Sequence, residues 1–303
     1  MLIDGVGALQ IPRSCFKTLS AGGVEIAIFS PLFARKTQGP RNLRNHRKMV
    51  IADGARLWAG GRNIAAEYFS GRNGAAPWRD LSFDLKGAVA AAAASQFEAD
   101  WVAAGGRPAS RVAASSQLVC GLDCGAGRAQ FLPSGPDQAE DTVQALLIDA
   151  CFHARQRVIA VTPYFVPDAA LETALRLAAR RGVKIDLVLP VVSNHRLADF
   201  ARNRALRALG NAGISIHLLP SMIHAKAVVF DESLAISGSV NLDSRSLLLN
   251  YECAVVFFGA REIDWLAAWV QSLIPEAQPF DCRAPGLLRD IAEGLLLTVA
   301  YQL

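Results

Sequence analysis

The chain has 303 residues and a formal net charge of +4, with 52% hydrophobic and 19% charged residues. This length is enough for two domains, and the composition excludes a disordered chain or a coiled coil. No apolar run approaches the roughly 18 residues that a membrane-spanning helix needs. The small positive net charge favours binding to an anionic surface or to a phosphate-bearing substrate. It does not by itself indicate a nucleic-acid-binding protein.

The first half of the chain predicts alternating strands and helices. Residues 1–3 predict a short apolar strand, residues 16–21 the end of a helix that stops at a glycine pair, and residues 24–26 the next strand. A further strand follows Asp80, and residues 88–103 predict a helix. Residues 105–127 are rich in small residues and lack any periodicity, which is typical of a connector.

The second half of the chain predicts the same alternation with more elements. Helices are predicted over residues 139–154, 169–180 and 262–273, and strands over 157–161, over 183–189 and after Glu252. Residues 286–303 predict an apolar helix that packs on this half or contacts a membrane surface. The alternation favours an α/β fold with mixed sheets in two domains, residues 1–125 and 126–303.

One pattern of residues occurs twice. A histidine, a lysine, an aspartate, a glycine and an asparagine recur at identical spacing in the two halves: His46, Lys48, Asp53, Gly60 and Asn63 match His224, Lys226, Asp231, Gly238 and Asn241. Lysine is scarce in this chain, so its presence at the same place in both copies argues against coincidence. The repeat indicates duplicated domains, which we expect to be related by pseudo-two-fold symmetry.

The two copies differ before the motif. The second half has a helix, a strand and another helix ahead of its strand at residues 183–189, and the first half begins only at the counterpart of that strand. We therefore expect a first domain that is truncated at its N-terminus, either because the chain is part of a longer protein or because the gene is shortened. The alternative is a complete first domain that has unusually few strands and helices.

The duplicated residues suit chemistry on a phosphodiester. Alternate side chains of a strand share one face, so His46 and Lys48 point the same way, as do His224 and Lys226. Positive charge and amide donors from both copies can bind one phosphate: Lys48, Lys226, Asn63 and Asn241. One histidine can attack phosphorus while the other, protonated, donates to the departing alkoxide.

Four carboxylates belong to this arrangement. Each histidine needs a partner that holds its tautomer, and Asp80 and Glu252, which begin matching strands, are the candidates. The alternative is that both are ordinary strand-edge residues. Asp53 and Asp231 are part of the motif and count among the catalytic candidates, yet each ends a strand, where an aspartate commonly fixes a turn.

These motifs resemble those of the phospholipase D superfamily, whose mark is a duplicated His-x-Lys-x4-Asp sequence. Further segments resemble bacterial cardiolipin synthases of that superfamily: residues 45–48, 60–64, 162–168, 238–246 and 250–252. The resemblance covers nearly the whole chain. It implies a metal-independent phosphatidyltransferase that condenses two phosphatidylglycerols to cardiolipin and glycerol through a phosphohistidine. It also implies that His46 is the nucleophile, His224 the general acid and Ser239 a further phosphate-binding residue.

The resemblance implies an anionic phospholipid partner, phosphatidylglycerol, and a peripheral location at the cytoplasmic membrane. It implies no cofactor and no obligatory nucleic acid, and it leaves the oligomeric state open. The residues likewise predict no metal site, because Cys120 and Cys124 lack a zinc-binding spacing and no histidine pair lies nearby.

Two alternatives to phosphatidyl transfer stay open. The same residues suit a phosphodiesterase that hydrolyses phospholipid or nucleic acid, although the modest charge and the lack of a basic groove with interleaved aromatic residues argue against nucleic acid. An inactive fragment or binding module is the second alternative. A basic run near the first motif (Arg41, Arg44, Arg47, Lys48) predicts either a solvated face or a site entrance that meets an anionic head group.

Overall fold

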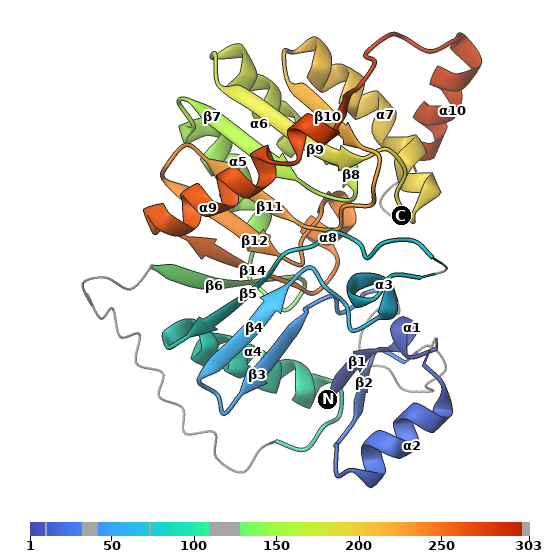
Figure 1. The fold of residues 1–303 in the computed structure, drawn as a ribbon, viewed down its shortest axis with the longest axis vertical. Helices are drawn as coiled ribbons and strands as arrows, with labels where there is room; N and C mark the ends of the chain where they lie inside the picture. Colours follow the sequence, from blue (N-terminus) through green and yellow to red (C-terminus); the bar gives the residue numbers. More distant parts are fainter. Residues whose placement is uncertain (10, 32–41, 73, 109–127, 299–303) are drawn as a thin grey trace.

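The first half of the chain lies on one side of the molecule and the second half on the other, and they meet along strand β6 (Ala129–Ser134) (Figure 1). This computed structural model describes residues 1–9, 11–31, 42–72, 74–108 and 128–298. The expected domain boundary at residue 125 lies outside the described residues, as do Cys120, Cys124 and Arg41. Within the described ranges, no helix is long and apolar enough to cross a membrane.

An eight-stranded mixed sheet forms the centre of the second half. Its strands run, from edge to edge, in the order β15 (Gln278–Pro279), β10 (Ser215–Leu219), β9 (Lys184–Pro190), β7 (Arg157–Val161), β11 (Ala227–Phe230), β12 (Leu234–Gly238), β14 (Glu252–Phe257) and β6. Strands β7, β9 and β10 are parallel, whereas the pairs from β11 to β6 are antiparallel. Both faces of β11 and β14 are buried, which explains why their sequences are nearly continuous apolar runs.

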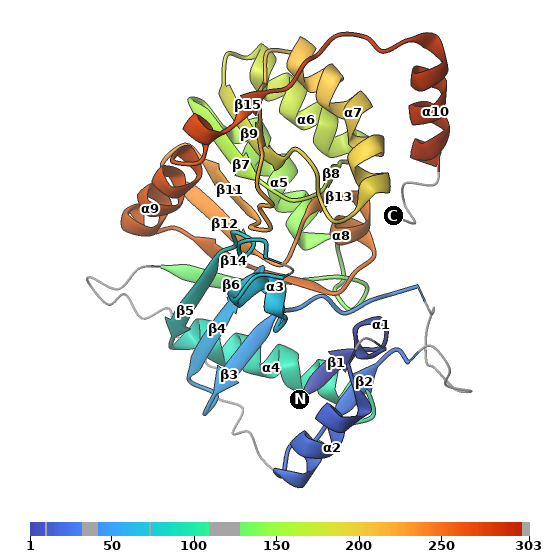
Figure 2. The ribbon, with the colours of Figure 1, turned by 45° about the vertical axis from the view of Figure 1, so that its right-hand side comes forward.

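Helices cover both faces of this sheet. One face packs against α5 (Thr142–His153), α6 (Ala169–Arg180) and α7 (Arg196–Asn211), and the other packs against α9 (Ala260–Gln271). Short elements lie at the sheet's edge: β8 (Phe165–Val166) pairs with β13 (Leu242–Asp243), which leads into α8 (Ser244–Leu248). After the short turn Ile274–Glu276, helix α10 (Leu287–Thr298) packs on α7 and projects from this half (Figure 2).

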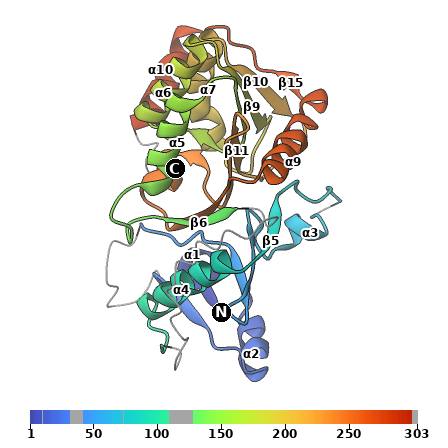
Figure 3. The same cartoon turned by 90° about the vertical axis from the view of Figure 1, so that its left-hand side faces the viewer.

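The first half holds two smaller sheets. Strands β1 (Leu2–Asp4) and β2 (Ala27–Phe29) are parallel, and β3 (Met49–Ala52), β4 (Arg56–Gly60) and β5 (Ser82–Lys86) form an antiparallel sheet. The helices of this half are α1 (Gly5–Ala8), α2 (Arg13–Ala21), α3 (Ala66–Phe69) and α4 (Ala88–Ala103). Helix α4 packs against the three-stranded sheet and reaches β6 (Figure 3).

In both halves a hairpin follows the histidine and lysine of the motif directly, so these residues precede the strand on which they were predicted. Ala52 of β3 lies opposite Arg56 of β4, and at the equivalent positions Phe230 of β11 lies opposite Leu234 of β12. The halves differ beside the hairpin: β7 lies between β11 and β9, whereas in the described part of the first half no strand joins β3 to β1. The truncation of the first domain stays a prediction. The pseudo-two-fold relation of the halves stays a prediction.

One hydrophobic cluster belongs to both halves. Leu57 and Ala90 from the first half pack in the same cluster as Ile159, Val229 and Ile263 from the second, and all five are buried. Separating the halves would expose this apolar surface to water, which is unfavourable. The two halves therefore stabilise each other.

An aspartate turns the chain at the tip of each motif hairpin. Asp53 and Asp231 have left-handed backbones, with φ of 53° and 50°, a conformation that aspartate tolerates better than most residues. Asp231 also accepts hydrogen bonds from the backbone amides of Arg155, Gln156 and Arg157 at 2.8–2.9 Å. Although burial acts in the opposite direction, these bonds hold the pKa of Asp231 below its ordinary value. They also fix the start of β7.

We expect Asp231→Ala to lower the free energy of unfolding by about 1–3 kcal/mol, because three backbone amides lose their acceptor. Asp53→Ala is the matched control, since it places alanine in the same left-handed turn, where the aspartate is exposed. Urea unfolding of the two variants measures the difference. Equal losses would mean that backbone strain, and not the carboxylate, causes the effect.

Candidate active site

The backbone brings each histidine beside a strand of the other half. The amide of His46 donates to the carbonyl oxygen of Tyr251 at 2.8 Å, and the amide of His224 donates to the carbonyl oxygen of Arg79 at 2.7 Å. Both contacts belong to short parallel bridges between the halves. The residue after each carbonyl is a predicted histidine partner, so these bridges set each histidine and one carboxylate side by side.

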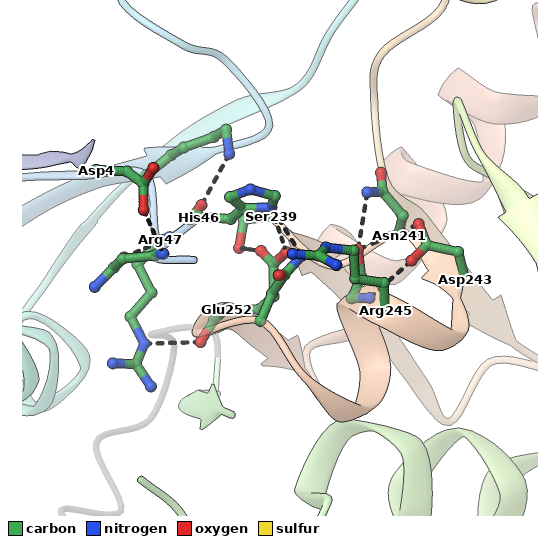
Figure 4. Close-up of polar contacts among 12 residues, drawn as sticks. Asp4, His46, Arg47, Ser239, Asn241, Asp243, Arg245 and Glu252 are labelled. Carbon is green, nitrogen blue, oxygen red and sulfur yellow. Dashed lines mark hydrogen bonds and ion pairs between the residues drawn. The ribbon is translucent and has the colours of Figure 1, made fainter. Parts of the chain in front are cut away.

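Each carboxylate pairs with the histidine of the other half. His46 Nδ1 lies 3.0 Å from Glu252 Oε1, and His224 Nδ1 lies 2.9 Å from Asp80 Oδ2. Both carboxylate side chains are fully buried, so each needs a hydrogen-bonding partner. Figure 4 draws the first of these pairs. The sequence predicts these carboxylates as histidine partners, but it does not indicate that each acts on the other half's histidine.

Ser239 supports the first pair. Its hydroxyl donates to Glu252 (Figure 4). It also accepts a hydrogen bond from the amide of Cys253 at 3.0 Å. Burial alone would raise the pKa of Glu252, but His46, Lys48 and this hydroxyl hold it below its ordinary value. The Ser239 hydroxyl faces two acceptors of the protein itself, Glu252 and the carbonyl oxygen of Cys253 at 3.2 Å, and its role as a direct phosphate ligand stays a prediction.

The two lysines lie beside the histidines of their own motifs. Lys48 Nζ donates to the carbonyl oxygen of His46 at 2.8 Å, and Lys226 Nζ lies 2.9 and 3.2 Å from the ring nitrogens of His224. Burial lowers the pKa of Lys226 to about 7, and burial together with Lys226 lowers the pKa of His224 to about 3. Lys48 also lowers both pKa values, so the two motifs share one electrostatic environment.

The two histidines differ in exposure. The side chain of His46 is 39% exposed and that of His224 is 7% exposed. The ring of His224 is enclosed by Tyr68, Trp78 and Tyr164, whose ring centroids lie 5.0, 5.9 and 6.2 Å away. Sequence reasoning missed Tyr68 and Trp78, because they have no aromatic counterpart at the matching positions of the second half; Tyr164 lies in the segment 162–168 but was not assigned to the site.

The two predicted asparagines donate to neighbouring hydroxyls. Asn63 Nδ2 donates to Tyr68 Oη at 2.9 Å, and Asn241 Nδ2 donates to Ser246 Oγ at 3.0 Å. Each acceptor follows its asparagine by five residues, and this shared spacing is a signal from which Tyr68 could have been found. Asn250, also absent from the sequence prediction, approaches His46 Nδ1 at 3.1 Å.

Asp53 and Asp231 do not join this group. Each lies seven residues beyond its motif histidine along an extended segment, which at about 3.3 Å per residue amounts to about 20 Å. Their inclusion among the catalytic candidates is therefore not supported. The alternative role, fixing the hairpin turn, is the one that their backbone conformation and the hydrogen bonds of Asp231 support.

Arg44 and Arg47 are buried, contrary to both expectations for the basic run. Arg47 forms ion pairs with Asp100 at 2.5 Å and Asp137 at 2.8 Å, and its Nε donates to the carbonyl oxygen of Glu252 at 2.9 Å (Figure 4). Neighbouring residues of an extended chain point to opposite sides, so Arg47 points away from the site. It ties the first motif to both halves of the chain.

The arrangement suits an anion the size of a phosphate. Two lysines supply positive charge, and the buried carboxylates are already paired with the histidines. Among the described residues, no group of three or more histidine, cysteine, aspartate and glutamate side chains is placed to hold a metal ion. The chemistry that these side chains can perform on a bound phosphate is nucleophilic attack, proton transfer and charge stabilisation.

The chain is similar in sequence to a known protein family. Residues 147–274 match a family model described as the PLD-like domain of cardiolipin synthase. The chain is 34% identical over 297 residues to cardiolipin synthase A of Pseudomonas aeruginosa, covering 96% of this chain and 59% of that protein. It is 32% identical over 279 residues to cardiolipin synthase A of Pseudomonas entomophila, covering 92% and 57%. The chain thus spans somewhat more than half the length of these relatives.

A solved structure supports the same fold. Phosphatidylserine synthase of Haemophilus influenzae matches all of this chain and 82% of its own, with a TM-score of 0.73 at 13% sequence identity. At that identity the likeness concerns the fold alone. The match to the family model and the similarity in sequence to the two relatives confirm the resemblance to PLD-like proteins and, among them, to the bacterial cardiolipin synthases.

Proposed function

We propose that this chain transfers phosphatidyl groups from one phosphatidylglycerol to another, as a cardiolipin synthase does, through a phosphohistidine intermediate. The observation that carries the proposal is the pair of imidazoles held by buried carboxylates, Glu252 on His46 and Asp80 on His224. The relatives named cardiolipin synthase A support the substrate class, although this chain spans just over half of their length.

In the first half-reaction His46 is the nucleophile. Because its Nδ1–H donates to Glu252, its Nε2 carries the lone pair, and its exposed ring is accessible to substrate. Nε2 forms a bond to phosphorus while the bond from phosphorus to the glycerol oxygen breaks. His224 is the source of the proton that this oxygen takes. A bound phosphodiester anion favours protonated His224, which burial and Lys226 disfavour in the free protein.

The second half-reaction reverses these roles. The free hydroxyl of a second phosphatidylglycerol attacks the phosphohistidine, its proton returns to His224, and the bond between phosphorus and His46 breaks to release cardiolipin. Lys48 and Lys226 offset the negative charge on the phosphate oxygens in both steps. Water in place of the second lipid would give phosphatidic acid, so the product distinguishes transfer from hydrolysis.

Helix α10 supports a peripheral membrane location. Four large apolar residues are exposed at helical spacing along it, Leu287, Leu288, Ile291 and Leu295. The opposite side is fastened to the protein, because the buried Glu293 pairs with Arg207 at 2.5 Å and Arg289 at 2.9 Å. An apolar helix face beside arginines is typical of a segment that lies on an anionic lipid surface.

His46→Asn is expected to lower the conversion of phosphatidylglycerol vesicles to cardiolipin and glycerol at least ~10³-fold, because it removes the nucleophile. His153→Asn, at an exposed histidine of α5, is the control and should retain the activity. Mass spectrometry identifies the products. An unchanged rate in His46→Asn contradicts the mechanism, and phosphatidic acid as the sole product contradicts the transferase assignment.

The burial of neutral His224 predicts that stability depends on pH. The pKa of His224 is about 3 in the folded chain and about 6.5 in an unfolded chain. Between these values the unfolded chain binds more protons, so the free energy of unfolding falls as pH falls, by up to about 1.4 kcal/mol per pH unit. Lys226, with a folded pKa of about 7, is protonated in both states across most of this window and adds little to the slope.

Urea unfolding between pH 7 and pH 4 measures this slope. We expect His224→Gln to reduce it relative to the unmodified chain, and His153→Gln to leave it unchanged. If His224→Gln and His153→Gln have the same slope as the unmodified chain, His224 does not carry the expected effect.

Replacing Leu288 and Ile291 together by aspartate is expected to lower co-sedimentation with phosphatidylglycerol vesicles by about tenfold or more, because each apolar side chain contributes about 1.5–3 kcal/mol when it leaves water. Val102→Asp changes an exposed apolar residue of α4 and should leave binding unaltered. Equal loss in both proteins would mean that added negative charge, and not the α10 surface, governs binding.

A further inference from the structure

The ring of His224 is almost enclosed by the protein. Its side chain is 7% exposed and its Nδ1 is paired with Asp80. Tyr68, Trp78 and Tyr164 surround its ring. Under the proposed function, however, a proton must pass between His224 Nε2 and the oxygen of a lipid alcohol. The group that faces Nε2 therefore decides how this proton travels.

Lys226 Nζ and a tyrosine hydroxyl both face that nitrogen, and of the two the hydroxyl leads towards the surface. Tyr68 Oη lies 3.3 Å from His224 Nε2, and it accepts a hydrogen bond from Asn63 Nδ2 at 2.9 Å. Tyr68 is 4% exposed, whereas Asn63 is exposed. The hydroxyl thus lies between the buried imidazole and a residue at the surface. Burial raises the pKa of Tyr68, so the phenol keeps its proton.

The hydrogen-bonding capacity of a phenol fits a relay. Tyrosine has one O–H donor and can accept two hydrogen bonds. When His224 is neutral, Tyr68 O–H donates to Nε2 and Asn63 supplies one bond to the phenolic oxygen. When His224 is protonated, Nε2–H and Asn63 fill both acceptor positions. The O–H of Tyr68 must then turn away from both, and it is free to donate to a substrate oxygen.

We propose that Tyr68 relays the proton between His224 and the lipid alcohol, an inference that rests on the proposed function. As the bond from phosphorus to glycerol breaks, the glycerol oxygen takes the proton of Tyr68, and Tyr68 takes the proton of His224 Nε2. His224 becomes neutral and its Nδ1–H stays with Asp80. When the second lipid attacks, its hydroxyl proton returns to His224 by the same two transfers.

The second half of the chain does not repeat this arrangement. Asn241 donates to Ser246, whose hydroxyl donates to Asp243 at 3.2 Å rather than reaching His46. His46 is more exposed and meets the substrate directly in the proposed reaction. A relay on His224 alone agrees with different roles for the two histidines. The nitrogen that attacks must contact phosphorus, whereas the proton donor can act through an intermediate group.

Two substrates separate a relay from a packing role. One is phosphatidylglycerol, whose leaving group is glycerol, and the other is an analogue in which p-nitrophenol replaces that glycerol. Nitrophenolate departs without taking a proton, so only the first substrate needs the relay. We expect Tyr68→Phe to lower kcat for phosphatidylglycerol about 100-fold with little change in KM, and to change kcat for the analogue less than about threefold.

Tyr164→Phe is the matched control, because its ring also contacts His224 while its hydroxyl donates to Asn194; it should produce no such selectivity. Asn63→Ala, which leaves Tyr68 intact, should give a smaller loss with the same preference for the analogue. Should Tyr68→Phe slow both substrates equally, or neither, while the unmodified chain makes cardiolipin, the relay is overturned and the proposed function stands. If the unmodified chain converts neither substrate, both proposals fail.

Discussion

Two buried carboxylates, each hydrogen-bonded to an imidazole of the opposite half, are the constraint on which this structure depends. Glu252 and Asp80 have no exposure to water, and a carboxylate left unpaired in such a place costs several kcal/mol. The segments just before β3 and β11, which hold His46 and His224, must therefore keep their register with the other half. The apolar cluster that both halves share also holds the halves together.

The same motif has different surroundings in the two halves. The residue between histidine and lysine is Arg47 in the first copy and Ala225 in the second, and both are buried. Arg47 joins an ionic network with Asp100 and Asp137, whereas Ala225 packs in the shared apolar cluster. Together with the unequal exposure of the two histidines, this difference gives duplicated residues separate roles in the proposed reaction.

Much of the fold could be predicted from the sequence where periodicity is strong. Helices α4 and α6 and strand β7 begin and end at the predicted residues. The duplicated motif predicted a strand for each histidine and lysine, but the strands begin just after them, β3 at Met49 and β11 at Ala227. It could not predict that Asp80 and Glu252 each pair with the histidine of the other half. Spacing within one half says nothing about which segment of the other half lies alongside.

Other features depend on partners that are far away in sequence. The burial of Arg47 requires Asp100 and Asp137, which are 53 and 90 residues further along the chain, and a run of arginines alone indicates a solvated surface. The hydrogen bond from Ser239 to Glu252 could not be predicted either. It depends on the register between β12 and β14, which places the hydroxyl beside the carboxylate. Tyr68 was overlooked because it is not duplicated.

The distance along the chain between paired residues has a consequence for biosynthesis. His46 and Glu252 are 206 residues apart, and Asp80 and His224 are 144 apart. Contacts of such long range form late, since the loop between them must first be closed. A nascent polypeptide on the ribosome that has not yet emerged as far as β14 contains both histidines but lacks the acceptor for the first, so the centre is assembled only after β14 has been synthesised.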